Sequence, residues 1–157
     1  MKLYLVRHAH AVSSTEDPAR PLSHKGRVVA QAMGQWLHGR VTPDLVEIWH
    51  SPLVRARETA ELVAEGLRLK APLREIAGLL PEDSTEAMAA ALTRHGDSVM
   101  IVGHEPHLST LAAELLGVSG GGIDVKKGAV LCLDRVLRGA PWSLLWHVNP
   151  ALVVGDE

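Results

Sequence analysis

The amino-acid sequence predicts a three-layer α/β fold, in which helices flank a mostly parallel central sheet and the chain closes with a pair of strands. Strand-like and helix-like segments alternate in the order βαβαβαβα before two final strand-like segments, which is typical of parallel sheets. The segments "KLYLVR" and "SVMIVGH" are apolar on both faces, as strands buried between two layers are. No repeat, linker or low-complexity tract interrupts the sequence, so we expect a single domain over residues 1–157.

The elements of the first half follow from local signals. Residues 2–7 are rich in Leu, Tyr and Val and form the first expected strand, and "HAVSSTEDPARP" is an aperiodic loop of turn formers. Ser23 is an expected N-cap for a helix that carries an apolar stripe and stops near Gly39. "LVEIWHSP" predicts the second strand, closed by Pro52, and "LVRARETAELVAEGLRL" predicts the second helix.

The second half continues the alternation. "PLREIAGL" predicts a short strand, and "STEAMAAALTRHG" predicts a helix with Ser84 as N-cap and Gly96 at its end. "SVMIVGH" is the next buried strand, followed by a helix through "HLSTLAAELLG". "GAVLCLDRV" and "WSLLWHV" are expected to form the closing strand pair, joined by "LRGAP".

Composition excludes several classes of partner. The formal net charge is −2, so no basic field indicates nucleic acid. Apolar runs are too short for a membrane span and no signal peptide is evident, so we expect a cytoplasmic protein without a membrane partner. Cys132 is the only cysteine and lies in an alternating apolar run, which predicts a buried structural thiol in a reducing compartment.

Polar residues cluster directly after three of the expected strands. Arg7 and His8 follow the first, "HSPLVRARET" follows the second, and "GHEPH" follows the fourth. Because ligands bind at the carboxyl ends of strands in an open α/β sheet, we expect these groups to meet at one edge. The candidates gathered there can all be cationic: Arg7, His8, Arg55, Arg57, His104 and His107.

Such a set of side chains suits an anion with several oxygen atoms. Guanidinium groups fit phosphate geometry, and the helix that begins near Leu53 adds backbone donors at its N-terminus. A neutral imidazole is also a good nucleophile near neutral pH and can carry a phosphoryl group covalently. The residues therefore favour a phosphoryl group as the ligand, with arginines stabilising its transition-state charge.

Other interpretations of these residues stay open at this point. "HAH" and "HEPH" could bind a metal, but neighbouring arginines repel a divalent cation and acidic or thiolate partners are missing, so we expect no metal. Arg57 could pair with Glu61 along the helix, and Arg55 with Glu58. The other histidines and the tryptophans fit surface, structural or core positions: His10, His24, His38, His50, His95, His147, Trp36, Trp49, Trp142 and Trp146.

The quoted motifs carry a resemblance to a known family. "LVRHAHA", "SPLVRARET" and "VGHEPHLS" resemble the three signatures of the histidine phosphatase superfamily, and "RPLSHKG" is similar to the segment before the family's first long helix. The resemblance extends from residue 3 to about residue 116. The R-H-A-x-A form and the small size are most similar to the SixA branch, the phosphohistidine phosphatases. The resemblance implies a phosphoglycerate mutase-like fold.

The resemblance also implies roles for four residues. His8 matches the nucleophile that becomes phosphorylated, whereas Arg7, Arg55 and His104 match residues that bind the phosphoryl group. The histidine matched by His104 also stabilises the transition state. Ala9 stands where many members have glycine, which matters only if the site needs a positive φ there.

Larger family members carry a proton-donating carboxylic acid in an insertion that precedes the second histidine, and this interval is short here. The acids available are Glu75, Glu82, Asp83 and Glu86. "LLPEDSTEA" favours Glu82 or Asp83, and we take Glu82 as the expected proton donor, although helix capping and solvation explain these acids equally well. An alkyl phosphate needs such a donor for its alkoxide leaving group, whereas a phosphohistidine has a labile P–N bond and an easily accommodated imidazole.

We therefore expect a metal-independent phosphatase, without a cofactor, that hydrolyses phosphohistidine on proteins through a phospho-His8 intermediate. Its partner is expected to be a phosphohistidine-containing protein, for example a phosphotransfer signalling domain, or a small phosphorylated substrate. Two alternatives stay open: a phosphomonoesterase acting on a small phosphorylated metabolite, and a non-catalytic module that binds phosphate or phosphoproteins.

Overall fold

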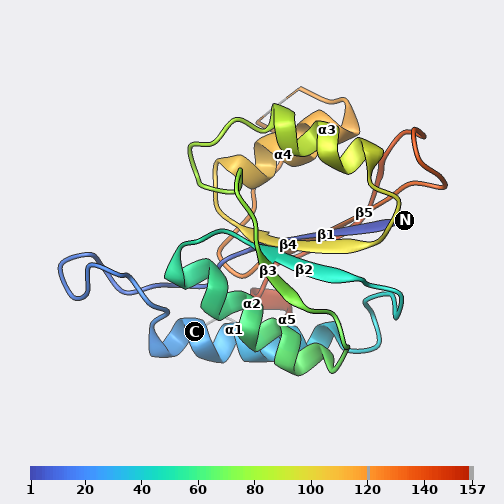
Figure 1. Ribbon diagram of the computed structural model, residues 1–157. Coiled ribbons are helices and arrows are strands. Elements are labelled where there is room, and N and C mark those ends of the chain that lie inside the picture. The colour runs from blue at the N-terminus through green and yellow to red at the C-terminus, as the bar shows by residue number, and fades with distance from the viewer. Residues whose placement is uncertain (120, 156–157) are drawn as a thin grey trace.

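The computed structural model describes residues 1–119 and 121–155, which form a six-stranded sheet with helices on both faces (Figure 1). The strands are β1 (Lys2–Arg7), β2 (Glu47–His50), β3 (Leu73–Glu75), β4 (Val99–Gly103), β5 (Val130–Asp134) and β6 (Ser143–Val148). The helices are α1 (His24–Leu37), α2 (Val54–Leu67), α3 (Glu86–Arg94), α4 (His107–Leu116) and α5 (Ala151–Val154). The predicted alternation and closing strand pair are confirmed, and α5 is an element that the sequence patterns did not predict.

The sheet is mostly parallel, as predicted. Its strand order is β3-β2-β4-β1-β5-β6, in which β3, β2, β4 and β1 run parallel to one another. β5 runs antiparallel to both β1 and β6. Leu3 pairs with Val99 and Arg7 pairs with Gly103, so the carboxyl ends of β1 and β4 lie level with each other. This register places the residues that follow these two strands side by side.

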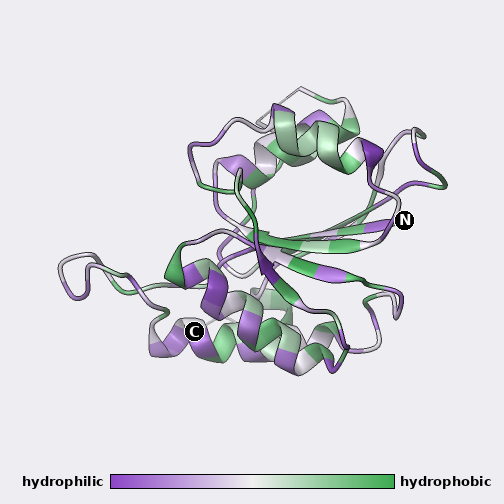
Figure 2. Ribbon diagram, viewed as in Figure 1, coloured by the Kyte–Doolittle hydropathy of each residue, from purple (hydrophilic) through white to green (hydrophobic). Residues whose placement is uncertain are grey.

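The central strands are apolar on both faces because each face is covered by helices. Leu3 and Leu5 belong to one core, and Tyr4 and Val6 belong to the core on the opposite side of the sheet. Successive strand side chains point to opposite faces, so a strand that is covered twice must be apolar at every position. Figure 2 shows β4 as mostly hydrophobic, whereas α1 and α2 mix hydrophobic and hydrophilic positions.

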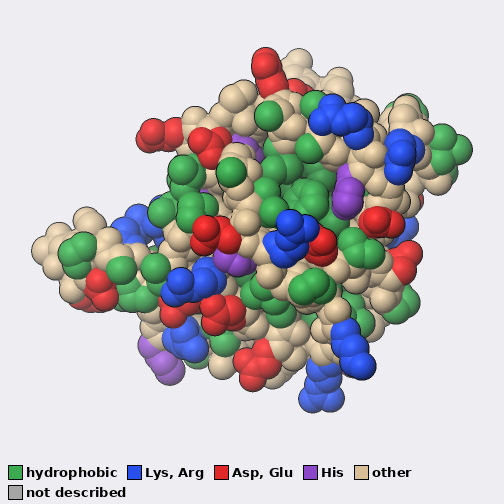
Figure 3. Space-filling view, in the orientation of Figure 1, with side chains coloured by type: hydrophobic (Ala, Val, Ile, Leu, Met, Phe, Trp, Pro, Cys, Tyr) green, Lys and Arg blue, Asp and Glu red, His purple; other side chains and the backbone are tan. Residues whose placement is uncertain are grey.

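Each core packs a different pair of helices against the sheet. Met33 and Leu37 of α1 pack with Val63 and Leu67 of α2 in the first core. The second core holds apolar residues of α3 and α4, including Leu92, and its hydrophobic side chains fill the space between these helices and the sheet (Figure 3). The two helical layers therefore leave the carboxyl edge of the parallel strands as the place where loops from both layers meet.

Two predicted helix caps have different outcomes. The Ser23 prediction is confirmed, since the Ser23 hydroxyl accepts a hydrogen bond from the Gly26 N–H at 3.0 Å. The Ser84 prediction is confirmed in part: Thr85 directly precedes α3 and makes no side-chain cap bond, but the Ser84 hydroxyl accepts a hydrogen bond from the Glu86 N–H at 3.3 Å. The Thr85 hydroxyl makes no cap bond because it donates to the Glu114 carboxylate of α4 at 2.6 Å.

The single thiol agrees with the sequence pattern around it. Cys132 on β5 is buried, and burial raises the pKa of its thiol to about 11, so the group is an inert core side chain at neutral pH. Among the described residues, no helix combines the length and apolar character that crossing a bilayer requires.

The close approach of α1 and α2 gives a stability prediction. A Cβ atom on Gly66 would lie 2.4 Å from the Gly34 carbonyl carbon, so Gly66→Ala must push the two helices apart. We expect the free energy of unfolding to fall by about 2 kcal/mol, the usual cost of overpacking, measured by urea titration. Gly122→Ala is the matched control, because a Cβ there meets nothing within 4 Å. Equal urea midpoints for the two variants would contradict the packing argument.

Candidate active site

His8 leaves the end of β1 with its ring held in one tautomer. Its backbone N–H donates to the Gly103 carbonyl at 3.0 Å, which ties the residue to the end of β4. Its ring Nδ1 lies 2.7 Å from the Ala9 carbonyl oxygen. Because a carbonyl oxygen only accepts hydrogen bonds, Nδ1 carries the proton. The neutral ring therefore keeps its lone pair on Nε2, the nitrogen available for attack on an electrophile.

His104 follows β4 and lies against His8. The two ring centroids are 5.0 Å apart, and the ring planes are inclined at 52°. The Nε2 atom of His104 lies 2.6 Å from the Ser51 hydroxyl, which follows β2 and is fully buried. The structure thus brings together residues that follow β1, β4 and β2 at one edge of the sheet. The Nδ1 atom of His104 is buried and has no hydrogen-bond partner.

Two guanidinium groups also present unpaired donors at this edge. Arg7 donates one N–H, from Nη1, to the Val125 carbonyl at 2.9 Å, which fixes its side chain. The Nε atoms of Arg7 and Arg55 are buried without a partner, as is Nδ1 of His104. A buried donor that is left unpaired is costly, so such a group points to a missing acceptor. An oxyanion supplies several acceptors at once.

Thr59 on α2 connects the β1 loop to Arg55. Its hydroxyl accepts from the Ala9 N–H at 3.0 Å and donates to the Arg55 carbonyl at 2.7 Å. This relay holds the loop after His8 against the first turn of α2. Ala9 itself is fully buried, and the non-glycine residues with positive φ in the described chain are Arg20 and Arg68. Ala9 therefore occupies ordinary backbone, and its methyl group imposes no strain at this position.

Burial and positive charge keep both histidines neutral. Burial lowers the pKa of His8 to about 4; the hydrogen bond to Ala9 opposes this shift, and the charges of Arg55 and Arg7 add to it. Burial lowers the pKa of His104 to about 3, with further lowering by His8 and Arg55. A protonated His8 could not attack, so the shifts keep the nucleophile competent at physiological pH.

The structure separates the two arginines of "SPLVRARET". Arg57 is exposed and pairs with Glu61 at 3.3 Å, so the helix ion pair considered from the sequence is confirmed. The Arg55–Glu58 pair considered alongside it does not form, because the Glu58 carboxylate accepts from the Leu22 N–H at 2.8 Å and lies 3.5 Å from Arg27. Arg55 forms no ion pair within residues 1–119 and 121–155, which leaves its guanidinium for a ligand.

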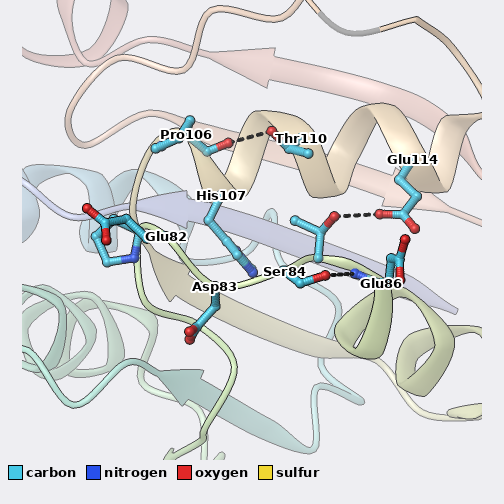
Figure 4. Close-up of a pocket in the computed structure, with 10 residues that line it drawn as sticks. Glu82, Asp83, Ser84, Glu86, Pro106, His107, Thr110 and Glu114 are labelled. Atoms are coloured by element: carbon cyan, nitrogen blue, oxygen red, sulfur yellow. Dashed lines mark hydrogen bonds between the residues drawn. The ribbon is translucent and has the colours of Figure 1, made fainter.

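Glu82 lies in the loop between β3 and α3 and lines a pocket with Pro106 and His107, close in sequence to His104 (Figure 4). Its side chain is exposed and makes no hydrogen bond with any described residue. Asp83 differs, because its carboxylate accepts from the Leu80 N–H at 2.9 Å and so closes a turn. Of the two acids favoured by the sequence, Glu82 is the one whose carboxylate is not engaged in a turn.

Sequence reasoning gave Ser51 and Thr59 no part in the site and placed His50 as a surface, structural or core residue. Ser51 and Thr59 both belong to the S-P-x-x-R-A-x-x-T pattern, so that pattern is the signal that could have found them. His50 is buried at the end of β2, where its Nδ1 donates to the Ser51 carbonyl at 2.8 Å. Ser51 contacts the His104 ring and Thr59 contacts the Arg55 carbonyl, so these residues shape the site by positioning its members.

Two further candidates lie apart from the histidine pair. His10 is partly buried near the site, with its Nδ1 atom 2.7 Å from the Ser23 hydroxyl. His107 is buried at the start of α4 and lines the pocket that also holds Glu82. No group of three or more His, Cys, Asp or Glu side chains suited to a metal occurs in the described part of the chain.

Comparison with known proteins places this arrangement in a family. Residues 3–80 match the model of the histidine phosphatase superfamily, branch 1. An uncharacterized protein from Picosynechococcus sp. is 33% identical over 141 residues, which is 85% of this chain and 84% of the relative. A solved structure of the protein histidine phosphatase SixA with tungstate has a TM-score of 0.86 and 24% identity, over 97% of this chain and 99% of that one. A phosphoserine phosphatase from Entamoeba histolytica with phosphoserine has a TM-score of 0.70 and 16% identity, over 95% and 97%.

The layered sheet and its edge define an α/β protein in which arginines lie near two neutral histidines at the ends of parallel strands. The chain belongs to the histidine phosphatase superfamily, branch 1. Its fold is phosphoglycerate mutase-like, as the resemblance implied, with the closing antiparallel strands β5 and β6.

The lowered pKa of His8 predicts the pH at which the free protein loses its neutral nucleophile. We expect the His8 ring to protonate near pH 4, so kcat/KM stays level from pH 7 to about pH 5 and falls below that. Because an unfolded histidine protonates at about pH 6.5, acidification through this window also lowers stability. NMR titration of the ring signals, assigned by their loss in His8→Ala, measures the value. A midpoint at or above pH 6 would contradict the account.

Proposed function

We propose that this protein is a metal-independent phosphohistidine phosphatase in which His8 takes the phosphoryl group from a phosphorylated protein. Arg7, Arg55 and His104 bind the phosphoryl oxygens, and His104 also stabilises the transition state. The observation that carries the proposal is the lone pair on His8 Nε2, together with the buried, unpaired Nε donors of Arg7 and Arg55 and the unpartnered Nδ1 of His104. A nucleophile and a set of empty oxyanion donors at one place favour phosphoryl transfer.

In the first step, the Nε2 lone pair of His8 forms a bond to phosphorus while the P–N bond to the substrate imidazole breaks. A substrate ring that carries a proton on its other nitrogen leaves as neutral imidazole, so this step needs no proton donor. His8 becomes a phosphorylated imidazolium that retains the proton on Nδ1. The Ala9 carbonyl, 2.7 Å from Nδ1, stabilises that positive charge.

In the second step, water attacks phosphorus and the bond to Nε2 breaks, which returns neutral His8 and releases dihydrogen phosphate. The same donors hold the oxygens in both steps, so no metal ion is needed to spread the charge. The short interval between Arg55 and His104 supports a protein substrate, because it carries no inserted lid. The likeness to the SixA structure with tungstate, a phosphate-like oxyanion, supports the same assignment.

A trapped intermediate tests the mechanism. After incubation with a phosphohistidine protein and quenching in alkali, we expect acid-labile phosphate on His8, located by mass spectrometry. His8→Ala should lose turnover by about 10³-fold or more, as removal of a nucleophile does. His10→Ala is the control, because it lies in the same loop and should retain turnover. Phosphate on another residue, full turnover in His8→Ala, or binding of phosphate analogues without any turnover would refute the proposal.

A second candidate is hydrolysis of a small phosphate ester, and the position of Glu82 favours it. Glu82 lines a pocket with Pro106, two residues from His104, and its carboxylate is not engaged by the described residues. A similar fold also serves a phosphoserine phosphatase. An ester needs a proton donor for its alkoxide, and Glu82 is the residue that we propose for that role.

Glu82→Gln separates the two substrates. If Glu82 protonates an alkoxide, the variant should hydrolyse phosphoserine about 10²-fold more slowly, the usual contribution of a general acid. Hydrolysis of phosphohistidine should change by less than about twofold, because its leaving imidazole needs no proton in that step. Glu75→Gln serves as the control acid. A wild-type enzyme that prefers phosphoserine over phosphohistidine would favour the ester function.

A further inference from the structure

A pocket of about 430 Å³ lies between the β3–α3 loop and the start of α4, beside the loop that carries His104 (Figure 4). Four carboxylates line it, and no lysine or arginine does: Glu82, Asp83, Glu86 and Glu114. Two of these carboxylates already accept one hydrogen bond, Asp83 from Leu80 and Glu114 from Thr85. A carboxylate has about four acceptor sites, so each keeps capacity for a ligand.

His107 provides a separate sign that this pocket binds something. The side chain is only 2% exposed, yet neither ring nitrogen has a hydrogen-bond partner. Figure 4 shows the ring pointing from α4 towards the segment that carries Asp83 and Ser84. Burial lowers the pKa of His107, against the opposing effects of Asp83 and of a long contact with the Gly78 backbone. The ring is therefore neutral, and the nitrogen that carries no proton is an acceptor. Buried polar atoms are normally hydrogen-bonded, so the accepting nitrogen of His107 points to a donor that a ligand would supply.

The pocket lies next to the catalytic histidines. The Leu108 N–H donates to the His104 carbonyl at 2.9 Å, so one turn of chain holds both His104 and His107. A group bound in the pocket therefore lies near a phosphoryl group held by His8 and His104.

Carboxylates beside an anion site carry a cost, because they repel the phosphoryl group. The opposite side of the site shows no such conflict, since its pocket of about 390 Å³ is lined by Lys25, Lys127 and His10. A substrate that brings a cation of its own removes the repulsion and turns it into attraction. The charge pattern thus fits a substrate with a positive group near its phosphoryl group.

We propose that the acidic pocket around His107 binds the ammonium or guanidinium group of a lysine or arginine side chain on the phosphohistidine-bearing protein. The inference rests on the proposed function and names a feature of its substrate. The cation donates to Glu86 and Glu114 and to the accepting ring nitrogen of His107. A protein surface is the source that we choose, because the pocket is set off from the catalytic histidines by the Glu105–Pro106 segment.

Phosphohistidine peptides test the proposal. In one series of peptides, a single lysine occupies in turn each of the four positions on either side of the phosphohistidine. In the matched series, norleucine occupies the same position, and kcat/KM is compared between the two. We expect the wild-type protein to prefer lysine at one or more positions by about fivefold in kcat/KM, the effect of a well-formed ion pair. E86Q/E114Q should reduce this preference below about twofold, with hydrolysis of phosphoramidate unchanged.

The control variant is E61Q/E65Q, which removes two carboxylates from the exposed face of α2 and should keep the full preference. His107→Leu should lose the preference while circular dichroism shows a folded chain, and E86Q/E114Q carries the test if that variant does not fold. Absence of a lysine preference in the wild type, or its survival in E86Q/E114Q, overturns the proposal.

Comparing the hydrolysis rates of ethyl phosphate and O-phosphoethanolamine shows whether the pocket serves a small aminoalkyl phosphate instead of a protein. A preference for the amine that disappears in E86Q/E114Q, without any lysine preference on peptides, would assign the pocket to a small aminoalkyl phosphate and overturn the protein assignment. Hydrolysis of phosphoramidate but of no phosphohistidine peptide would refute the proposed function itself, together with this inference. Hydrolysis of peptides without lysine preference would refute only the pocket assignment.

Discussion

β1 and β4 pair in parallel with Arg7 opposite Gly103, and the candidate site depends on that register. It makes the next residues, His8 and His104, neighbours, and the hydrogen bond from the His8 N–H to the Gly103 carbonyl locks them there. The ring contact at 5.0 Å follows from this pairing. A slip of one residue would turn every β1 side chain to the opposite core, so the apolar packing on both faces protects the register.

The site combines cationic side chains with imidazoles that stay neutral, and burial explains how both coexist. Burial disfavours the charged form of an imidazole, and the neighbouring guanidinium groups of Arg7 and Arg55 add to that effect. The same positive charge that lowers the pKa of His8 attracts the phosphoryl group. The Ala9 carbonyl then directs the lone pair to Nε2, so the backbone selects the attacking atom.

The surroundings of the site are asymmetric in charge, which bears on the substrate rather than on the chemistry. Lys25 and Lys127 line a pocket on the α1 and α5 side, whereas carboxylates and His107 line the pocket on the α3 and α4 side. A bare phosphate ester gains from the first pocket alone. A protein surface can present groups to both, so the proposed protein substrate and the proposed cation subsite support one model of recognition.

The sequence by itself determined the α/β alternation, the doubly buried strands and the four residues proposed for the phosphoryl group, because these depend on local periodicity and on motifs within a few residues. Only the tertiary structure decided what those residues touch. The Ser51–His104 and Ala9–Thr59 contacts join residues 53 and 50 positions apart. The hydrogen bond from the Thr85 hydroxyl to Glu114 of α4 joins residues 29 positions apart. Long-range contacts of this kind depend on how the layers pack, which no local pattern encodes.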